Sequence, residues 1–164
     1  MVWCFIWCNG WICNWNNNKF NFSKMKVLEF RMEIEPMGAV RTTRQGKYSE
    51  RAVRYHEWMT KLKWLWINEC LQKGLDKQYI LPDSIDYIEF GLSINDPSKK
   101  SNKHVVSMIG MPHQKKPDLD NLYKALVDSI CYKKDDSHIW EVGKMKKIYS
   151  DFQKGYIFVR VIQK

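Results

Sequence analysis

The sequence predicts an α+β fold in which two main helices pack on a small mixed sheet. Three observations lead to this prediction: some stretches alternate apolar and charged residues, others repeat apolar residues at helical spacing, and the two kinds are mixed along the chain. A chain of 164 residues can bury a core without disulfides. We divide it into an atypical N-terminal extension, 1–24, and a main domain, 25–164.

Strands are predicted where apolar residues occupy every second position. In 27–35 the even positions are apolar and the odd ones mostly charged, as in a half-buried strand. The stretch 85–95 alternates in the same way, and 105–110 is predicted to be its hairpin partner. A closing pair of strands is predicted at 140–149 and 156–162.

Two helices are predicted from apolar residues at helical spacing. The first begins after Ser49, a suitable N-cap, and ends near Gly74. Its tryptophans are most simply core residues, although part of that face is a candidate dimer interface, because aromatic residues favour such surfaces. These tryptophans are Trp58, Trp64 and Trp66. The second helix covers 118–131 and follows Pro117, which suits a helix start.

The N-terminal extension differs from the rest of the chain in its tryptophans, cysteines and asparagine run. It lacks the basic segment of a signal peptide, and its apolar stretch is too short to span a bilayer. A surface helix is one interpretation, but basic residues on an opposite face are missing. We favour a disordered segment or a translation start at Met25. The five cysteines are odd in number and loosely spaced, which favours a reduced, cytoplasmic protein.

The chain is basic, with 27 Lys and Arg residues against 18 Asp and Glu, a formal net charge of +9. Such a charge attracts polyanions, of which nucleic acid is the commonest, although a basic protein without such a partner is also consistent with it. Several lysines fit phosphate contacts or a solubilising surface, Lys144, Lys146 and Lys147 among them.

Four aspartates accompany the second predicted helix: Asp118, Asp120, Asp135 and Asp136. If the first two are extended, their side chains point the same way with Cα atoms roughly 7 Å apart and can converge on one cation. If they are helical, they diverge. Mg²⁺ would relieve the repulsion among such acids, because it binds carboxylate oxygens and keeps several waters. Lys124, on the helical face of Asp120, could steady a phosphate.

Each of these residues also has an ordinary structural interpretation. Asp118 suits an N-cap, and Asp120 with Lys124 makes a common helical ion pair. Asp135 and Asp136 suit a solvated turn. The residues by themselves therefore leave a metal site and a structural role both open. The four scattered histidines are expected to be structural or surface residues.

The motif as a whole resembles the signature of the RusA-like endodeoxyribonucleases. From Lys116 it reads Lys-Pro-Asp-Leu-Asp-Asn-Leu-Tyr-Lys-Ala-Leu-Val-Asp-Ser-Ile, and an Asp-Asp pair follows. The stretch 36–44 and Tyr48 are similar to that family's basic loop, with a departure at Ala39 and Val40, where many members carry further basic or proline residues. The resemblance covers the chain from about Val27 to its C-terminus.

The resemblance implies a homodimeric enzyme that uses Mg²⁺, with Mn²⁺ as a substitute, to resolve Holliday junctions by paired nicking in DNA recombination and repair. Its metal ligands would be Asp118, Asp120 and Asp136, with Asp135 as a helper, and Lys124 would be the catalytic lysine. The residues expected to contact DNA are Arg41, Arg44, Lys47, Lys115 and Lys116. Two alternatives stay open: a DNA-binding module without catalysis, and a metal-dependent nuclease acting on other branched DNA or on RNA.

Overall fold

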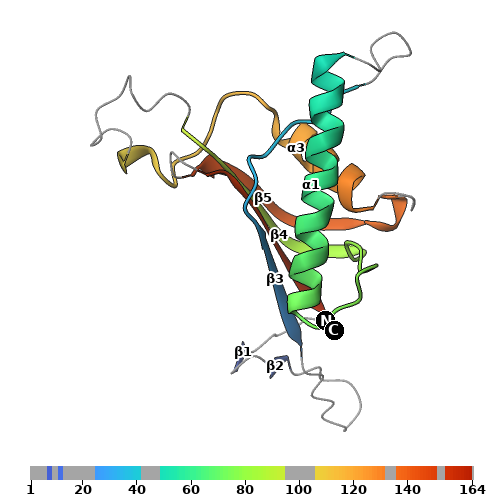
Figure 1. The fold of residues 1–164 in the computed structure, drawn as a ribbon. Coiled ribbons are helices and arrows are strands. Elements are labelled where there is room, and N and C mark those ends of the chain that lie inside the picture. Colours follow the sequence, from blue (N-terminus) through green and yellow to red (C-terminus); the bar gives the residue numbers. More distant parts are fainter. Residues whose placement is uncertain are drawn as a thin grey trace, which may run out of the picture.

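The computed structural model describes residues 7–8, 11–12, 25–41, 49–94, 106–131, 136–150 and 154–163. A four-stranded mixed sheet forms its centre, in the order β3-β6-β4-β5, and confirms the predicted α+β class (Figure 1). The strands are β3 Lys26–Met32, β4 Ser84–Leu92, β5 Glu141–Tyr149 and β6 Tyr156–Gln163. The helices are α1 Glu50–Gln72, α3 Leu119–Ile130 and the short 3₁₀ helix η2 Asp136–His138.

Within the N-terminal extension, β1 (Trp7–Cys8) and β2 (Trp11–Ile12) pair antiparallel. The remaining residues of the extension lie outside the described part of the chain, so its predicted disorder stays a prediction. Among the described residues, no helix combines the length and the apolar character needed to cross a bilayer.

The pairing of the strands corrects the predicted closing pair. β6 lies between β3 and β4 and runs antiparallel to both, whereas β5 pairs with β4 in parallel. Parallel strands need a crossover connection, and α3 lies in the connection between β4 and β5. Because this helix separates β4 from β5, β5 returns beside β4 instead of forming a hairpin with β6.

The predicted hairpin partner at 105–110 is also wrong in its described part. Residues 106–108 form a helical turn, and the chain then runs antiparallel along the outer edge of β5, where Pro112 bridges Ile148. Backbone N–H groups of Gly110 and His113 donate to β5 carbonyl oxygens at 2.8 and 3.1 Å. A hairpin on β4 is excluded because β5 and β6 already occupy both of its edges.

The core lies between the sheet and the two helices, which cover the same face of it (Figure 1). Trp66 confirms the core prediction for the tryptophans of α1: it is buried, its ring lies 4.4 Å from that of Phe30, and its Nε1 donates to the carbonyl oxygen of Tyr79 at 2.8 Å. Trp58 is half-buried, and Trp64 is 63% exposed, so the core prediction is wrong for Trp64.

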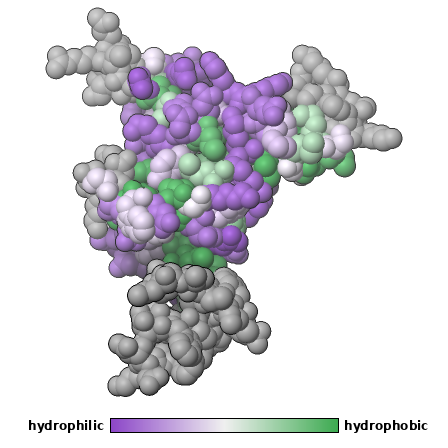
Figure 2. Space-filling view, turned by 180° about the vertical axis from the view of Figure 1, so that it is seen from behind, coloured by the Kyte–Doolittle hydropathy of each residue, from purple (hydrophilic) through white to green (hydrophobic). Residues whose placement is uncertain are grey.

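The opposite face of the sheet is open and carries paired charges. Figure 2, which looks at the molecule from behind α1, shows a largely hydrophilic surface broken by small apolar patches. At its centre the Glu89 carboxylate accepts hydrogen bonds from the hydroxyls of Tyr87 and Tyr156 and forms an ion pair with Lys146 Nζ at 2.7 Å. The outward-facing residues of β4, β5 and β6 are therefore tied to one another.

Candidate active site

The backbone of Asp118 caps the start of α3, but its side chain takes no part in the cap. Its φ and ψ of −72° and 154° are extended, and its carbonyl oxygen accepts from Leu122 N at 3.1 Å. A capping aspartate normally accepts a backbone N–H with its carboxylate, but the Asp118 side chain makes no such bond. The N-cap interpretation therefore holds for the backbone alone, and the carboxylate stays available for another partner.

Asp120 lies in the first turn of α3 and, like Asp118, is exposed. The backbone of Asp118 is extended, whereas that of Asp120 is helical. The two side chains therefore do not point the same way as they would in a strand. Among the described residues, neither carboxylate has a hydrogen bond or an ion pair. Two exposed acids at a helix N-terminus are tolerated because the helix dipole favours negative charge there.

Lys124 turns away from Asp120 in this structure. Its Nζ lies 3.6 Å from Asp128 Oδ1, four residues further along α3, and its side chain is 61% exposed. The predicted ion pair with Asp120 is thus replaced by one with Asp128. Exposed pairs of this kind contribute only a few tenths of a kcal/mol, so a phosphate near Asp120 can compete for the ammonium.

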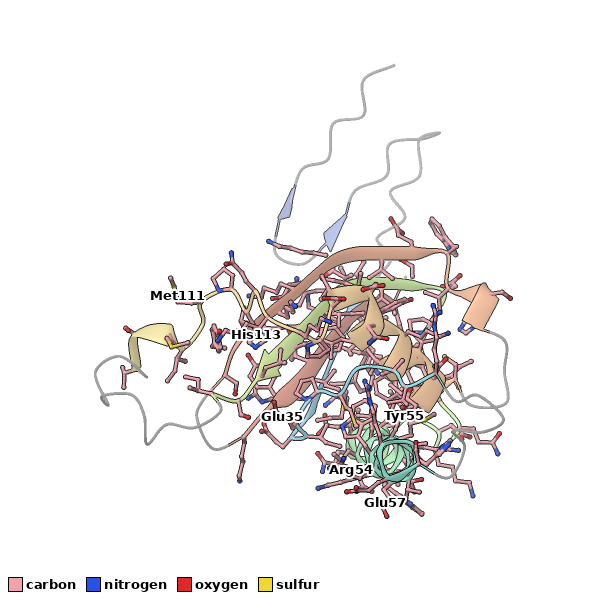
Figure 3. All side chains as sticks on the ribbon, turned by 90° about the horizontal axis from the view of Figure 1, so that it is seen from above. Glu35, Arg54, Tyr55, Glu57, Met111 and His113 are labelled. Carbon is pink, nitrogen blue, oxygen red and sulfur yellow. The ribbon has the colours of Figure 1, made fainter. Side chains whose placement is uncertain are left out.

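Tyr55, on α1, lies between α1 and α3 and was not singled out by the sequence (Figure 3). Its hydroxyl is buried and has no partner among the described residues. Burial, together with the negative charge of Asp128, raises the pKa of Tyr55 to about 12, so the hydroxyl keeps its proton. A single tyrosine at a helical core position carries no sequence signal for this arrangement.

The segment after β3 approaches the start of α3 closely. Ala39 N donates to the carbonyl oxygen of Asn121 at 3.1 Å. A Cβ atom on Gly38 would lie 2.8 Å from Asn121 Nδ2 and 2.9 Å from Pro117 Cβ, so only glycine fits without displacing a neighbour. This contact holds residues 38–39 beside the acidic motif, and Arg41, the last described residue of this segment, is exposed.

The other predicted DNA contacts are partly described. Lys115 and Lys116 are exposed on the segment before α3, where they can meet a phosphate. Arg44 and Lys47 lie outside the described residues. Two lysines that fitted phosphate contacts take part in the fold instead: Lys146 pairs with Glu89, and Lys147 Nζ donates to the carbonyl oxygens of Lys115 and Pro117, each at 2.7 Å.

Of the second acidic pair, the structure describes only the backbone of one member. Asp135 lies outside the described residues, and Asp136 is described only as the start of η2. After η2, Trp140 N donates to Asp83 O at 3.0 Å, beside the start of β5, whereas the segment before Asp118 is bound to Lys147, near its end. Six residues of strand separate these places by roughly 20 Å. The ligand roles of Asp135 and Asp136 stay predictions.

His113 has the structural character expected of the histidines. It is buried and packs on Tyr149 with ring centroids 4.7 Å apart, and its Nδ1 has no partner among the described residues. Burial and the nearby charge of Lys147 lower the pKa of His113, so its imidazole stays neutral near pH 7. A neutral, enclosed ring of this kind supports the fold.

The donor chemistry of Asp118 and Asp120 fits Mg²⁺. This ion is commonly held by one or two carboxylates, with waters and substrate phosphate completing its shell. In the part of the chain that the structure describes, no three His, Cys, Asp or Glu side chains gather into a larger metal cluster. Two exposed acids without other partners are therefore the described ligands that the ion would use.

These features define a small α+β protein with an acidic helix start beside exposed basic residues. The model of the family Endodeoxyribonuclease RusA matches residues 33–161, which is most of the chain. The chain therefore belongs to the RusA family of endonucleases, and the resemblance seen in the motif is confirmed. A comparison with curated proteins gives no match.

Proposed function

We propose that this protein is a Mg²⁺-dependent, structure-selective endodeoxyribonuclease that resolves Holliday junctions by paired nicking, in DNA recombination and repair. One observation carries the proposal within the family match: Asp118 occupies a capping position, yet its carboxylate makes no capping bond. Among the described residues, neither this carboxylate nor that of Asp120 has a hydrogen bond or an ion pair.

The described residues suit the cleavage of a phosphodiester. When bound, Mg²⁺ lowers the pKa of water and stabilises the charge of the phosphate in an in-line displacement. Asp118 and Asp120 would hold that ion, and the N–H groups at the start of α3 would favour the phosphate itself. Lys124, released from its exposed pair with Asp128, neutralises negative charge that develops on the phosphate oxygens. Arg41, Lys115 and Lys116 hold the DNA backbone.

Paired nicking calls for two equivalent sites, and we propose a homodimer that supplies them. A two-fold dimer matches the two-fold symmetry of a four-way junction. The exposure of Trp64 on α1 supports an interface there, because aromatic side chains are enriched at protein interfaces. Two copies of a chain with a net charge of +9 would also bind the crowded phosphates of a junction strongly.

A second candidate function is a DNA-binding protein without nuclease activity. It is favoured by the position of η2, since the described backbone places Asp136 toward the far end of α3 from Asp118. A metal held by two carboxylates has fewer anionic ligands than the resemblance implies. In this alternative, Asp118 and Asp120 would only favour the helix start.

Cleavage of a labelled four-way junction, beside linear duplex of the same sequence, tests the proposal. Asp120→Asn is compared with Asp83→Asn, which removes the same charge from an exposed aspartate outside the motif. We expect Mg²⁺-dependent paired nicks in the wild type and in Asp83→Asn, and none in Asp120→Asn. Tight junction binding without cleavage in Mg²⁺ or Mn²⁺ would favour the second candidate. Equal cutting of linear duplex or RNA would remove junction selectivity from the proposal.

A further inference from the structure

Lys147 forms three hydrogen bonds with the segment that leads into the acidic motif. Its backbone carbonyl oxygen accepts from His113 N at 3.1 Å. Its Nζ donates to the carbonyl oxygen of Lys115 and to that of Pro117, each at 2.7 Å. The second of these carbonyls belongs to the peptide group that joins Pro117 to Asp118. The last of these hydrogen bonds therefore lies directly before Asp118, the first acid of the motif.

The position of Lys147 in the sheet makes these contacts unusual. Side chains alternate between the two faces of a strand, and Lys144 and Lys146 occupy one face of β5. Lys147 shares the other face with Met145, which packs against the core on the side of the helices. A lysine on a core-facing side is uncommon, because its ammonium must find partners. Here two of its three N–H donors meet backbone carbonyl oxygens.

Backbone hydrogen bonds to β5 hold this segment as far as His113 and leave its end to other contacts. Pro117 carries no N–H, so it cannot join the edge of the sheet through a backbone donor. The carbonyl oxygens of Lys115 and Pro117 need donors, and the Lys115 backbone also has a hydrogen bond with His113. Hydrogen bonds from an ammonium are roughly twice as strong as those between neutral groups. Lys147 thus fixes two peptide groups with one charged side chain.

We propose that Lys147 is a positioning residue, which sets the backbone before α3 so that the carboxylates of Asp118 and Asp120 are presented to one divalent cation. This inference rests on the proposed function, because it assumes that these two acids are metal ligands. Groups that orient metal ligands in this way commonly change metal affinity by about 10–100-fold when they are removed. Lys147 touches neither the cation nor the DNA in this role.

The test measures Mn²⁺ binding by titration calorimetry on the whole protein, without DNA. Lys147→Met keeps most of the side-chain length and removes every donor, and Lys147→Arg keeps the charge and the donors. Lys144→Met is the matched control, because it removes the same charge from an exposed position on the other face of β5. Thermal unfolding of each variant shows whether a change in binding follows a change in folding.

We expect Lys147→Met to weaken Mn²⁺ binding by about 10–100-fold, Lys147→Arg to recover part of the loss, and Lys144→Met to bind within about twofold of the wild type. If Lys147→Met does not fold, Lys147→Leu, which also lacks side-chain donors, takes its place with the same expectation. A lowered melting temperature with unchanged Mn²⁺ binding would overturn the positioning role, as would tighter binding, which would mean that the ammonium merely repels the cation. Either result leaves Mg²⁺-dependent cleavage by the wild type intact, whereas a wild type that neither binds Mn²⁺ nor cleaves would remove the proposed function as well.

Discussion

The open face of the sheet and the start of α3 both carry acids, but the two regions treat them in opposite ways. On the open face, Glu89 is bound by Lys146 and two tyrosine hydroxyls, and Asp86 by Arg160 Nε at 2.6 Å. At the start of α3, the carboxylates have no partner among the described residues. The partners of an acid, more than its presence, therefore distinguish a structural carboxylate from one that is available for chemistry.

Glu89 shows what a structural acid looks like in this fold. Burial by itself would raise the pKa of Glu89, but the hydrogen bonds from Lys146, Tyr156 and Tyr87 outweigh it and hold that pKa below its usual value. One of its partners changes as well: burial and the hydrogen bond to Glu89 raise the pKa of Tyr156 to about 12. The group is therefore an ionised carboxylate whose two oxygens are both bound by protonated neighbours.

The largest expected effect is a loss of cleavage when the acids at the start of α3 are replaced. Replacing both Asp118 and Asp120 with Asn should lower the rate of junction cleavage by about 1,000-fold, since the metal contributes several kcal/mol and about 1.4 kcal/mol is a factor of ten. The melting temperature should change little, because the repulsion lost between two like charges offsets their lost interaction with the helix dipole. Single-turnover cleavage and thermal unfolding measure the two quantities. A large loss of stability would show that these acids are structural, as Glu89 is.

The reverse result is expected on the open face. Glu89→Ala should cost about 2 kcal/mol of unfolding free energy, because it strands the Lys146 ammonium and two tyrosine hydroxyls in a half-buried setting. Cleavage per folded molecule should be unchanged. Glu29→Ala, an exposed acid on β3, is the control and should cost less than about 0.5 kcal/mol. Denaturant unfolding gives both values, and equal losses would show that the paired acid is no more structural than the free one.

Much of the fold could be predicted from the sequence because burial leaves a periodic trace. The alternation in β3 and β4 and the helical spacing of α3 predict which residues lie inside, as Phe30 and Leu122 do. The same patterns say nothing about which strands are neighbours. The parallel pairing of β4 with β5 follows from the crossover through α3, and the turn at 106–108 follows from the occupied edges of β4.

The candidate site could be predicted in part for a similar reason. Asp118, Asp120 and Lys124 can be proposed as a site from the sequence because the motif is local and specific, and the family match covers it. The contributions of Lys147 and Gly38 could not be predicted, because they depend on segments distant in the sequence that meet at Pro117. A lysine that binds backbone carbonyls looks in the sequence like any other basic residue.

A smaller effect is expected where the basic loop meets the motif. Gly38→Ala would place a methyl group against Pro117 and the Asn121 side chain, and overpacking of this kind costs about 1–3 kcal/mol unless the loop moves. We expect stability to fall by about 1 kcal/mol, at the lower end of that range, and junction binding to weaken more than that loss explains. Gly74→Ala is the control: its φ of 69° makes alanine strained there, away from the motif. Equal junction affinity in the two variants would contradict a functional contact at Gly38.

The smallest expected effect is the contribution of Glu89, on the open face, to the pH dependence of stability. The pKa of Glu89 is lower in the folded protein than its ordinary value of 4.5, so the unfolded chain binds more protons in the acidic range. The stability that Glu89 contributes is therefore fully present above about pH 4.5 and is lost as the pH falls through the folded pKa. Denaturant unfolding at pH 7 and at pH 4 measures this loss, which should be smaller in Glu89→Gln, because the amide does not titrate. Asp120→Asn should keep the wild-type loss on acidification, since its carboxylate has no described partner whose hydrogen bond could be lost. An Asp120→Asn protein that lost this pH dependence would show that the acids at α3 also stabilise the fold, and the distinction between the two regions would fail.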